Sequence, residues 1–297
     1  MIAPARNRID LHTHTARSDG VLPPLTLYGH MRAWGSTLVA ITDHDTLAGV
    51  RELLEAGLGA PGGEGPRLIV GVEINTAVDE EVEAAGGSQE RLGELHILGL
   101  GVDPSDVTFE SVLSEQRRGR ERRIELTLAR LRELGLPVDE HLPQVAGGID
   151  ALGRPHVARA LVAAGHAEDV QDAFTRYLVP GMPAYVRRQG VGPRAAIETI
   201  AAAGGIASLA HSPWAPHEPA VLDLLMGWGL RGLEVHYQGW EDECVEAMAA
   251  CADERSLLRT GGSDYHGDTG SYAEAQARVH VPDAVGEQLL QALAPGS

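Results

Sequence analysis

Short apolar runs alternate with amphipathic segments along most of the chain. The apolar runs are bounded by glycine, proline or polar residues, as is typical of buried strands. They lie at residues 8–12, 38–41, 68–72, 94–100, 205–210, 232–235 and 257–258. Helices are expected between or after them, at residues 23–34, 46–57, 193–203 and 284–293, and a last short strand is expected at 277–281. This alternation predicts an α/β fold.

Residues 104–192 interrupt the alternation. Clear strand signals disappear there, and helices are expected at residues 109–134, 154–164 and 168–178. A stretch of this length without a strand is much longer than an ordinary crossover connection. We therefore predict a barrel-like α/β domain built from residues 1–103 and 193–297, with residues 104–192 inserted as a helical subdomain.

Residues of metal-ligating type stand at the ends of the predicted strands. His12 and His14 are separated by one residue, as are Asp264 and His266, so each pair projects to one side of an extended backbone. The other strand-end residues of this kind are His44, Glu73, His96 and His211. Side chains gathered at the carboxyl ends of strands are what the active site of an α/β barrel requires.

These side chains form a coherent ligand set for metal ions. With Asp19 added there are nine of them: His12, His14, Asp19, His44, Glu73, His96, His211, Asp264 and His266. Imidazole and carboxylate groups without a thiolate suit Mn, Fe or Zn, and Mg is the further alternative. Nine ligands exceed the needs of one ion and predict two or three divalent ions, with one carboxylate bridging. Two such ions can share a hydroxide that attacks phosphorus.

Composition restricts the possible partners. The chain has 297 residues and a formal charge of −18, and all of its 24 basic residues are arginines. A broad surface for duplex DNA is therefore not expected, whereas a small anionic substrate held by a few arginines and metals is. There is no apolar run long enough for a membrane span and no signal peptide, which favours a cytoplasmic protein. The sequence does not determine the oligomeric state.

Taken together, the motifs resemble one known family. The segments around His12-x-His14, Thr-Asp-His44-Asp, Gly-Val-Glu73, His96-Ile-Leu-Gly, Ala-His211 and Ser-Asp264-Tyr-His266 are similar, in order, to those of the polymerase and histidinol phosphatase (PHP) family of metal-dependent phosphoesterases. The resemblance implies a distorted (β/α)7 TIM-like barrel with a trinuclear metal site. One metal would be held by His12, His14, Glu73 and Asp264, a second by Glu73, His96 and His211, and a third by Asp19, His44 and His266.

The helical insertion resembles that of the small-nucleotide branch of this family. That branch includes nucleoside 3′,5′-bisphosphate phosphatase, AMP phosphatase and a 5′-to-3′ exoribonuclease. The resemblance implies hydrolysis of a phosphomonoester of a small nucleotide, with trimming of short RNA as a further activity. Two details depart from the pattern: Ser212 separates His211 from Pro213, and His236-Tyr237-Gln238 replaces the usual tyrosine-histidine order.

Several residues are candidates for substrate contacts. Arg120 and Arg123 form an i,i+3 pair on an arginine-rich helix, and we expect them to share a face. Arg154 and His156 flank the start of the next helix, where free amides favour anions. We predict that Glu73 bridges the metals, that Arg154 neutralises charge on the phosphoryl group, and that His156 protonates or orients the leaving oxygen. His236 is a further candidate for substrate binding.

The same motifs are compatible with other functions. A histidinol-phosphatase-like enzyme would use the same motifs. Amidohydrolase barrels also begin with His-x-His, but many of them need a carbamylated lysine, and this chain contains no lysine. The missing lysine also excludes a P-loop NTPase. A metal-binding module without turnover is the non-enzymatic alternative, against which the complete ligand series argues.

Overall fold

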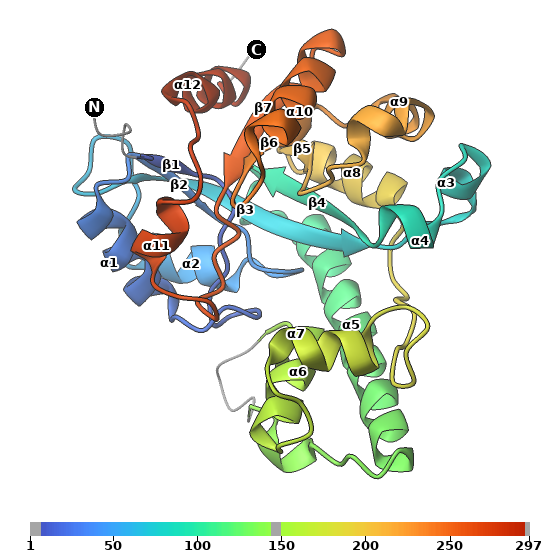
Figure 1. Ribbon diagram of the computed structural model, residues 1–297. Helices are drawn as coiled ribbons and strands as arrows, with labels where there is room; N and C mark the ends of the chain where they lie inside the picture. Colours follow the sequence, from blue (N-terminus) through green and yellow to red (C-terminus); the bar gives the residue numbers. More distant parts are fainter. Residues whose placement is uncertain (1–6, 144–149, 295–297) are drawn as a thin grey trace.

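The computed structural model describes residues 7–143 and 150–294 and contains one seven-stranded sheet. The strands are hydrogen-bonded in chain order (Figure 1). They are β1 Ile9–Asp10, β2 Leu38–Ile41, β3 Arg67–Thr76, β4 Leu95–Leu100, β5 Ile206–Leu209, β6 Gly232–Tyr237 and β7 Leu258–Gly262. Each predicted apolar run supplies one of them, so the α/β interpretation is confirmed.

The two ends of the sheet come together. The Leu11 amide donates to the Gly261 carbonyl at 3.0 Å, and the Asp264 amide donates to the His12 carbonyl at 2.8 Å. Thr13 and Tyr265 add an isolated parallel bridge just beyond the strands. The sheet is therefore nearly closed into a barrel, and the predicted distorted TIM-like fold is confirmed.

One strand runs against the others. β4 pairs antiparallel with both β3 and β5, whereas the other neighbouring pairs are parallel. The prediction that His96 lies at the carboxyl end of its strand is wrong. His96 is the second residue of β4, and the reversed direction brings this amino-terminal end to the barrel end where the other strands finish.

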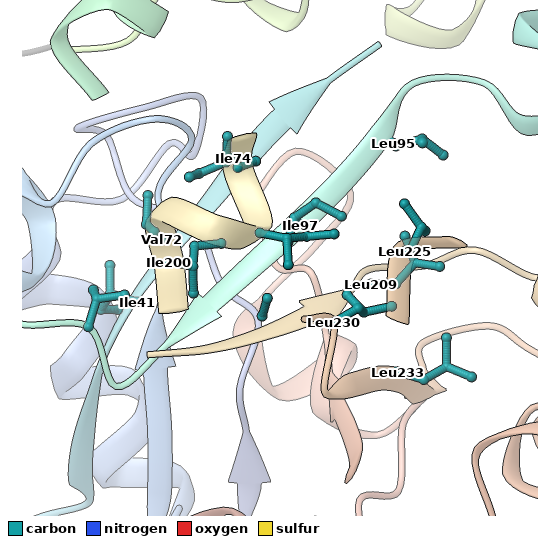
Figure 2. Close-up of a cluster of buried hydrophobic side chains, with 14 of the residues drawn as sticks. Ile41, Val72, Ile74, Leu95, Ile97, Ile200, Leu209, Leu225, Leu230 and Leu233 are labelled. Carbon is teal, nitrogen blue, oxygen red and sulfur yellow. The ribbon is translucent and has the colours of Figure 1, made fainter. Parts of the chain in front are cut away.

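Helices pack around the barrel, and the buried apolar residues of barrel and helices form two clusters. They are α1 Pro24–Trp34, α2 Ala48–Glu55, α3 Glu80–Ala84, α4 Gln89–Leu92, α8 Pro193–Ala202, α9 Pro219–Gly227, α10 Asp242–Glu254, α11 Tyr272–Gln276 and α12 Asp283–Ala292. Figure 2 shows Ile200 of α8 beside Val72 and Ile97 of the sheet. Gly99 allows this approach, since a Cβ there would lie 3.0 Å from Ile200 and 3.1 Å from Val72.

The segment between β4 and α8 is helical, as predicted. It contains α5 Val107–Glu133, a short 3-10 turn at Asp139–His141, α6 Arg154–Ala163, α7 Val170–Ala173 and a π-helical turn at Phe174–Leu178. In Figure 1 α5 extends away from the barrel, with α6 and α7 beside it. Buried residues of these elements, including Leu131 and Leu161, form an apolar cluster separate from the barrel core. The domain limits at residues 104 and 192 stay a prediction.

Two local features differ from the expected elements. The acidic residues 79–83, where no helix was expected, begin α3, because the Asp79 side chain accepts from the Val82 amide at 3.1 Å and caps the helix. The strand expected at 277–281 does not form. Val279 and Val281 are buried, but the Val281 amide donates to the Asn7 side chain at 2.9 Å instead of to a neighbouring strand.

Within residues 7–143 and 150–294, no helix is long and apolar enough to cross a membrane. Cys244 and Cys251 are both free and lie on α10.

The seam between β1 and β7 depends on a glycine. A Cβ on Gly262 would lie 2.5 Å from the amide nitrogen of His12 and 2.9 Å from Asp10 Oδ1. We expect Gly262→Ala to lower the free energy of unfolding by about 1–3 kcal/mol, measured by urea denaturation. Gly29→Ala is the matched control, because Gly29 lies in α1 with open space around it. It should be neutral or stabilising by up to about 1 kcal/mol. Equal stability of the two variants would contradict a tight seam.

Candidate metal centre

All nine predicted metal ligands meet at one end of the barrel. They come from the loop after β1, the ends of β2, β5 and β7, the body of β3 and the start of β4. Two of them, His211 and Asp264, have positive φ angles of 28° and 47°. Non-glycine residues adopt this region at an energetic cost that is typical of functional sites. The structure therefore brings the nine side chains together, with two of them held in strained backbone.

Glu73 lies at the centre of the group and is buried. Five imidazole nitrogens lie within 3.3 Å of its two carboxylate oxygens, those of His12, His14, His44, His96 and His211. Burial alone raises the pKa of Glu73, but His44 and His12 outweigh it and hold this pKa well below the ordinary value. Glu73 is therefore a buried anion that is accessible to ligands on both of its oxygens.

The donor atoms fall into three overlapping groups. Within each group every ligand atom lies within 4.8 Å of the others. The groups are His12, His14, Glu73 and Asp264; His14, Asp19, His44 and His266; and His44, Glu73 and His96. The first agrees with one predicted set, and the second adds His14 to another. The third contains His44 where the prediction had His211, although His211 Nε2 lies 3.1 Å from Glu73 Oε1.

The donor set fits cations. His12 Nε2 and His14 Nε2 face each other at 3.2 Å, and Asp264 Oδ1 lies 3.1 Å from His14 Nε2. His14 Nδ1, His44 Nδ1 and Asp264 Oδ1 are buried without a hydrogen-bond partner among the described residues. Buried polar atoms of this kind are costly unless a partner compensates them. Divalent ions bound between them would do so.

Glu234 orients one of the imidazoles, and sequence reasoning missed it. Its carboxylate lies 3.1 Å from His12 Nδ1 and accepts from the His211 amide at 2.7 Å. A carboxylate on Nδ1 favours the tautomer that leaves the Nε2 lone pair facing the centre. The available signal was a charged residue inside an otherwise apolar strand, at a position now seen to be fully buried.

A bulge in β6 exchanges the expected roles of His236 and Tyr237. Strand alternation would place His236 on the same side as Glu234, but the register with β7 shifts between these two residues. Tyr237 consequently lines the cavity and donates to Asp264 Oδ2 at 2.8 Å. His236 lies outside the cavity, where burial and the charges of Arg259 and His280 lower its pKa to about 4. The structure therefore does not bring His236 to the site.

A cavity of about 250 Å³ opens beside the metal-ligand cluster. Besides candidate metal ligands, its lining includes guanidinium groups of the helical segment and of the residues that follow it. These are Arg120, Arg123, Arg154 and Arg188. Three of the four were predicted, and Arg188 was not, because it lies in an irregular segment whose sequence carries no motif.

Two buried carboxylates hold these arginines in pairs. Glu94 lies 2.7 Å from Arg123 and 2.9 Å from Arg154. Asp45 lies 2.5 Å from Arg120 and 2.9 Å from Arg188. Burial raises the pKa of each carboxyl group, but the two neighbouring guanidinium groups outweigh burial and lower it. Both carboxylates are therefore ionised anchors at neutral pH.

The structure gives His156 a different place from the one expected. It is buried, and its Nδ1 accepts from the Gly153 amide at 3.0 Å at the start of α6. It is absent from the lining of the cavity. Burial lowers its pKa, which keeps the ring neutral and suits this accepting role. The geometry assigns His156 to capping the helix that presents Arg154, and it does not support the predicted contact with the leaving oxygen.

Comparison with known proteins decides the family. The PHP domain model matches residues 10–178, more than half of the chain. The chain belongs to the PHP family. It is 34% identical over 286 residues to a 5′-3′ exoribonuclease of Haemophilus influenzae, covering 94% of this chain and 96% of that relative. It is 30% identical over 273 residues to a 3′,5′-nucleoside bisphosphate phosphatase of Chromobacterium violaceum, covering 87% of each.

A solved structure agrees with this PHP assignment. A Bifidobacterium adolescentis protein described as a metal-dependent phosphoesterase superposes with a TM-score of 0.79 at 33% identity, over 97% of both chains. The enzyme class expected from the motifs, a metal-dependent phosphoesterase, is confirmed at the level of the family.

Glu73 gives the sharpest test of the centre. Because its carboxylate touches five of the candidate ligands, we expect Glu73→Gln to lose most of the bound metal, measured by elemental analysis after dialysis. Phosphoesterase activity should fall by more than about 100-fold. Glu121→Gln, an isosteric change at an exposed position on α5, is the control and should keep both properties. A Glu73→Gln protein with full metal content would contradict the bridging assignment.

Proposed function

We propose that the chain hydrolyses a phosphomonoester of a small nucleotide, either a nucleoside 3′,5′-bisphosphate or AMP. One observation carries the proposal: a single cavity is lined both by seven of the nine candidate ligands and by four arginines, while the other two ligands, His12 and His14, contact Glu73 in its lining. The first set suits divalent cations, and the second suits a phosphoryl group. The two relatives named above, an exoribonuclease and a nucleoside bisphosphate phosphatase, support a nucleotide as substrate.

The nine clustered residues would hold two or three divalent ions, and Mn, Fe or Zn fits imidazole and carboxylate ligands best. Bound there, such ions supply Lewis acidity and a nucleophile derived from water at neutral pH. Glu73 is the bridging ligand in this proposal, since it contacts members of all three predicted metal sets. Glu234 and Tyr237 restrain His12 and Asp264, so that their donor atoms keep facing the centre.

The arginines bind and orient the phosphoryl group in this proposal. Guanidinium groups match phosphate geometry because they donate parallel N–H groups. Arg120 Nη2 is buried without a hydrogen-bond partner among the described residues, and so it has a donor left for a ligand. Pairing with Asp45 and Glu94 leaves each arginine little freedom to lose when substrate binds. The negative phosphoryl group then binds beside four arginines of fixed orientation, although the protein as a whole has a net charge of −18.

We further propose that residues 104–192 act as the substrate-binding subdomain. All four cavity arginines come from this stretch, on α5, at the start of α6 and in the segment before α8. The barrel provides the candidate metal ligands. The reaction therefore depends on how the helical segment docks over the barrel end.

A phosphate-release panel with Mn²⁺ tests the substrate class. It compares AMP, adenosine 3′,5′-bisphosphate, histidinol phosphate and a short 5′-phosphorylated RNA. We expect adenosine 3′,5′-bisphosphate or AMP to give the highest kcat/KM. A preference for histidinol phosphate would move the chain to a different substrate class, and no release from any compound would support a module without turnover.

Substitution of Arg154 tests substrate binding without disturbing the candidate metal ligands. Loss of a charge-assisted hydrogen bond of about 1.5–3 kcal/mol corresponds to a rise in KM of roughly 10- to 150-fold for Arg154→Ala. Metal content should stay at the wild-type level, because Arg154 contacts Glu94 and none of the nine ligands. Arg118→Ala on α5 is the control, since Arg118 is exposed and paired with Glu115. Unchanged kinetic constants in Arg154→Ala would remove this residue from the substrate site.

A further inference from the structure

Helix α6 lies between the apolar cluster of the helical segment and the barrel loops that carry Asp19 and His266. Its buried apolar residues all belong to that cluster, and they are Val157, Ala158, Ala160 and Leu161. The ion pairs between α6 and the barrel come from two arginines, Arg154 at the start of the helix and Arg159 further along it. The helix is thus joined to its own segment by apolar packing and to the barrel by ion pairs.

Arg159 binds both of these loops at once. Its Nε and Nη2 atoms donate to the two carboxylate oxygens of Asp268 at 2.8 and 2.5 Å, and Nη2 also donates to the Asp19 carbonyl at 2.6 Å. Asp19 is a candidate metal ligand, and Asp268 closely follows another one, His266. Two parallel hydrogen bonds to one carboxylate give such an ion pair both strength and a fixed direction. Arg159 therefore attaches α6 to the two loops in one orientation.

The loops have other contacts that hold them in place. The buried carboxylate of Asp43 accepts hydrogen bonds of 2.6 to 2.7 Å from an amide and two hydroxyl groups of the turn before Asp19. The Val21 amide donates to the His266 carbonyl at 2.8 Å and joins the two loops. The loops thus keep their shape independently of Arg159, which leaves α6 as the element that Arg159 positions.

Arg154 connects this attachment to the cavity. It is the first residue of α6, it lines the cavity, and its Nη2 lies 2.9 Å from Glu94. Arg159 does not line the cavity, and the helical rise places it about 7.5 Å further along the axis of α6. A binding group must be held within about 0.5 Å of its productive position, so a small shift of α6 is enough to misplace the Arg154 guanidinium. Arg159 therefore reaches a ligand in the cavity through Arg154.

We propose that Arg159 is a positioning residue for Arg154. By binding α6 to the loops that carry Asp19 and His266, it keeps the Arg154 guanidinium at a fixed distance from the metal-ligand cluster, so that one phosphoryl group can contact both. The proposal rests on the proposed function, because it needs a phosphoryl group at this place. It assigns Arg159 no contact of its own with substrate or metal.

The test measures the binding of inorganic phosphate to the Mn²⁺-loaded protein by isothermal titration calorimetry. Arg159→Ala removes the attachment of α6 to both loops, and Asp268→Asn removes one charge from it while keeping the side-chain volume. Each change is also made in an Arg154→Ala background. A double-mutant cycle of this kind shows whether the effect of Arg159 passes through Arg154.

Arg176→Ala is the matched control. Arg176 has the same kinds of partner as Arg159, since it donates to the Asp172 carboxylate and to the His166 carbonyl, both at 3.1 Å. All three residues lie within the helical segment. The control therefore removes an arginine with similar hydrogen bonds and leaves the attachment of α6 to the barrel intact.

We expect the Kd for phosphate to rise about fivefold to tenfold in Arg159→Ala and about threefold in Asp268→Asn. KM for the nucleotide substrate should rise to the same extent, with kcat changed by less than about twofold and metal content at the wild-type level. In the Arg154→Ala background the same two changes should alter the Kd by less than about 1.5-fold. Arg176→Ala should behave like the wild type in all of these measurements.

Three results would overturn the assignment: an undiminished effect in the Arg154→Ala background, a loss of bound metal, or wild-type phosphate binding in both variants. If Arg159→Ala does not fold, the isosteric Asp268→Asn variant decides between these outcomes. If no nucleotide is hydrolysed, the proposed function fails, whereas the phosphate measurements still decide the role of Arg159.

Discussion

Burial of the Glu73 carboxylate is the constraint on which the site depends. A buried negative charge is costly, and its surroundings must supply positive or hydrogen-bonding partners from several directions. Here five imidazoles contribute, carried by four separate segments of the barrel end. Such convergence requires a sheet that curves back on itself, so that residues after β1 and β7 become neighbours. The candidate metal ligands therefore come together only because the barrel closes.

Two kinds of contact hold the barrel in this form, namely close packing at glycines and hydrogen bonds to buried carboxylates. Gly262 lets β7 approach His12, and Gly99 lets α8 pack against β4. Beneath the ligands, buried Asp10 accepts from the amide and hydroxyl of Ser263, and Glu234 braces both His12 and His211. The ligand loops are thus held by hydrogen bonds that leave the donor atoms pointing at the centre.

The helical segment and the residues after it place four positively charged arginines close to the candidate metal centre. Four arginines near one cavity repel one another, and they would also repel bound metals. Glu94 and Asp45 offset this repulsion, since each carboxylate pairs with two guanidinium groups. The pairing keeps the arginines in fixed orientations and lowers the net charge, while donors such as Arg120 Nη2 remain for a ligand. The cavity arginines and the candidate metal ligands therefore come from different parts of the chain, which allows mutations to test them separately.

The sequence by itself determined the strands, most helices, the nine clustered side chains and the family, because these depend on local periodicity and on short motifs read in order. It did not determine the direction of β4, which reverses the place of His96, nor the bulge in β6 that turns Tyr237 inward and His236 outward. It also missed Glu234, Glu94 and Arg188, whose partners lie far away in the chain. Strand direction, register and long-range ion pairs arise from packing between distant segments. Only the tertiary structure could decide them, since no local pattern records which segments become neighbours.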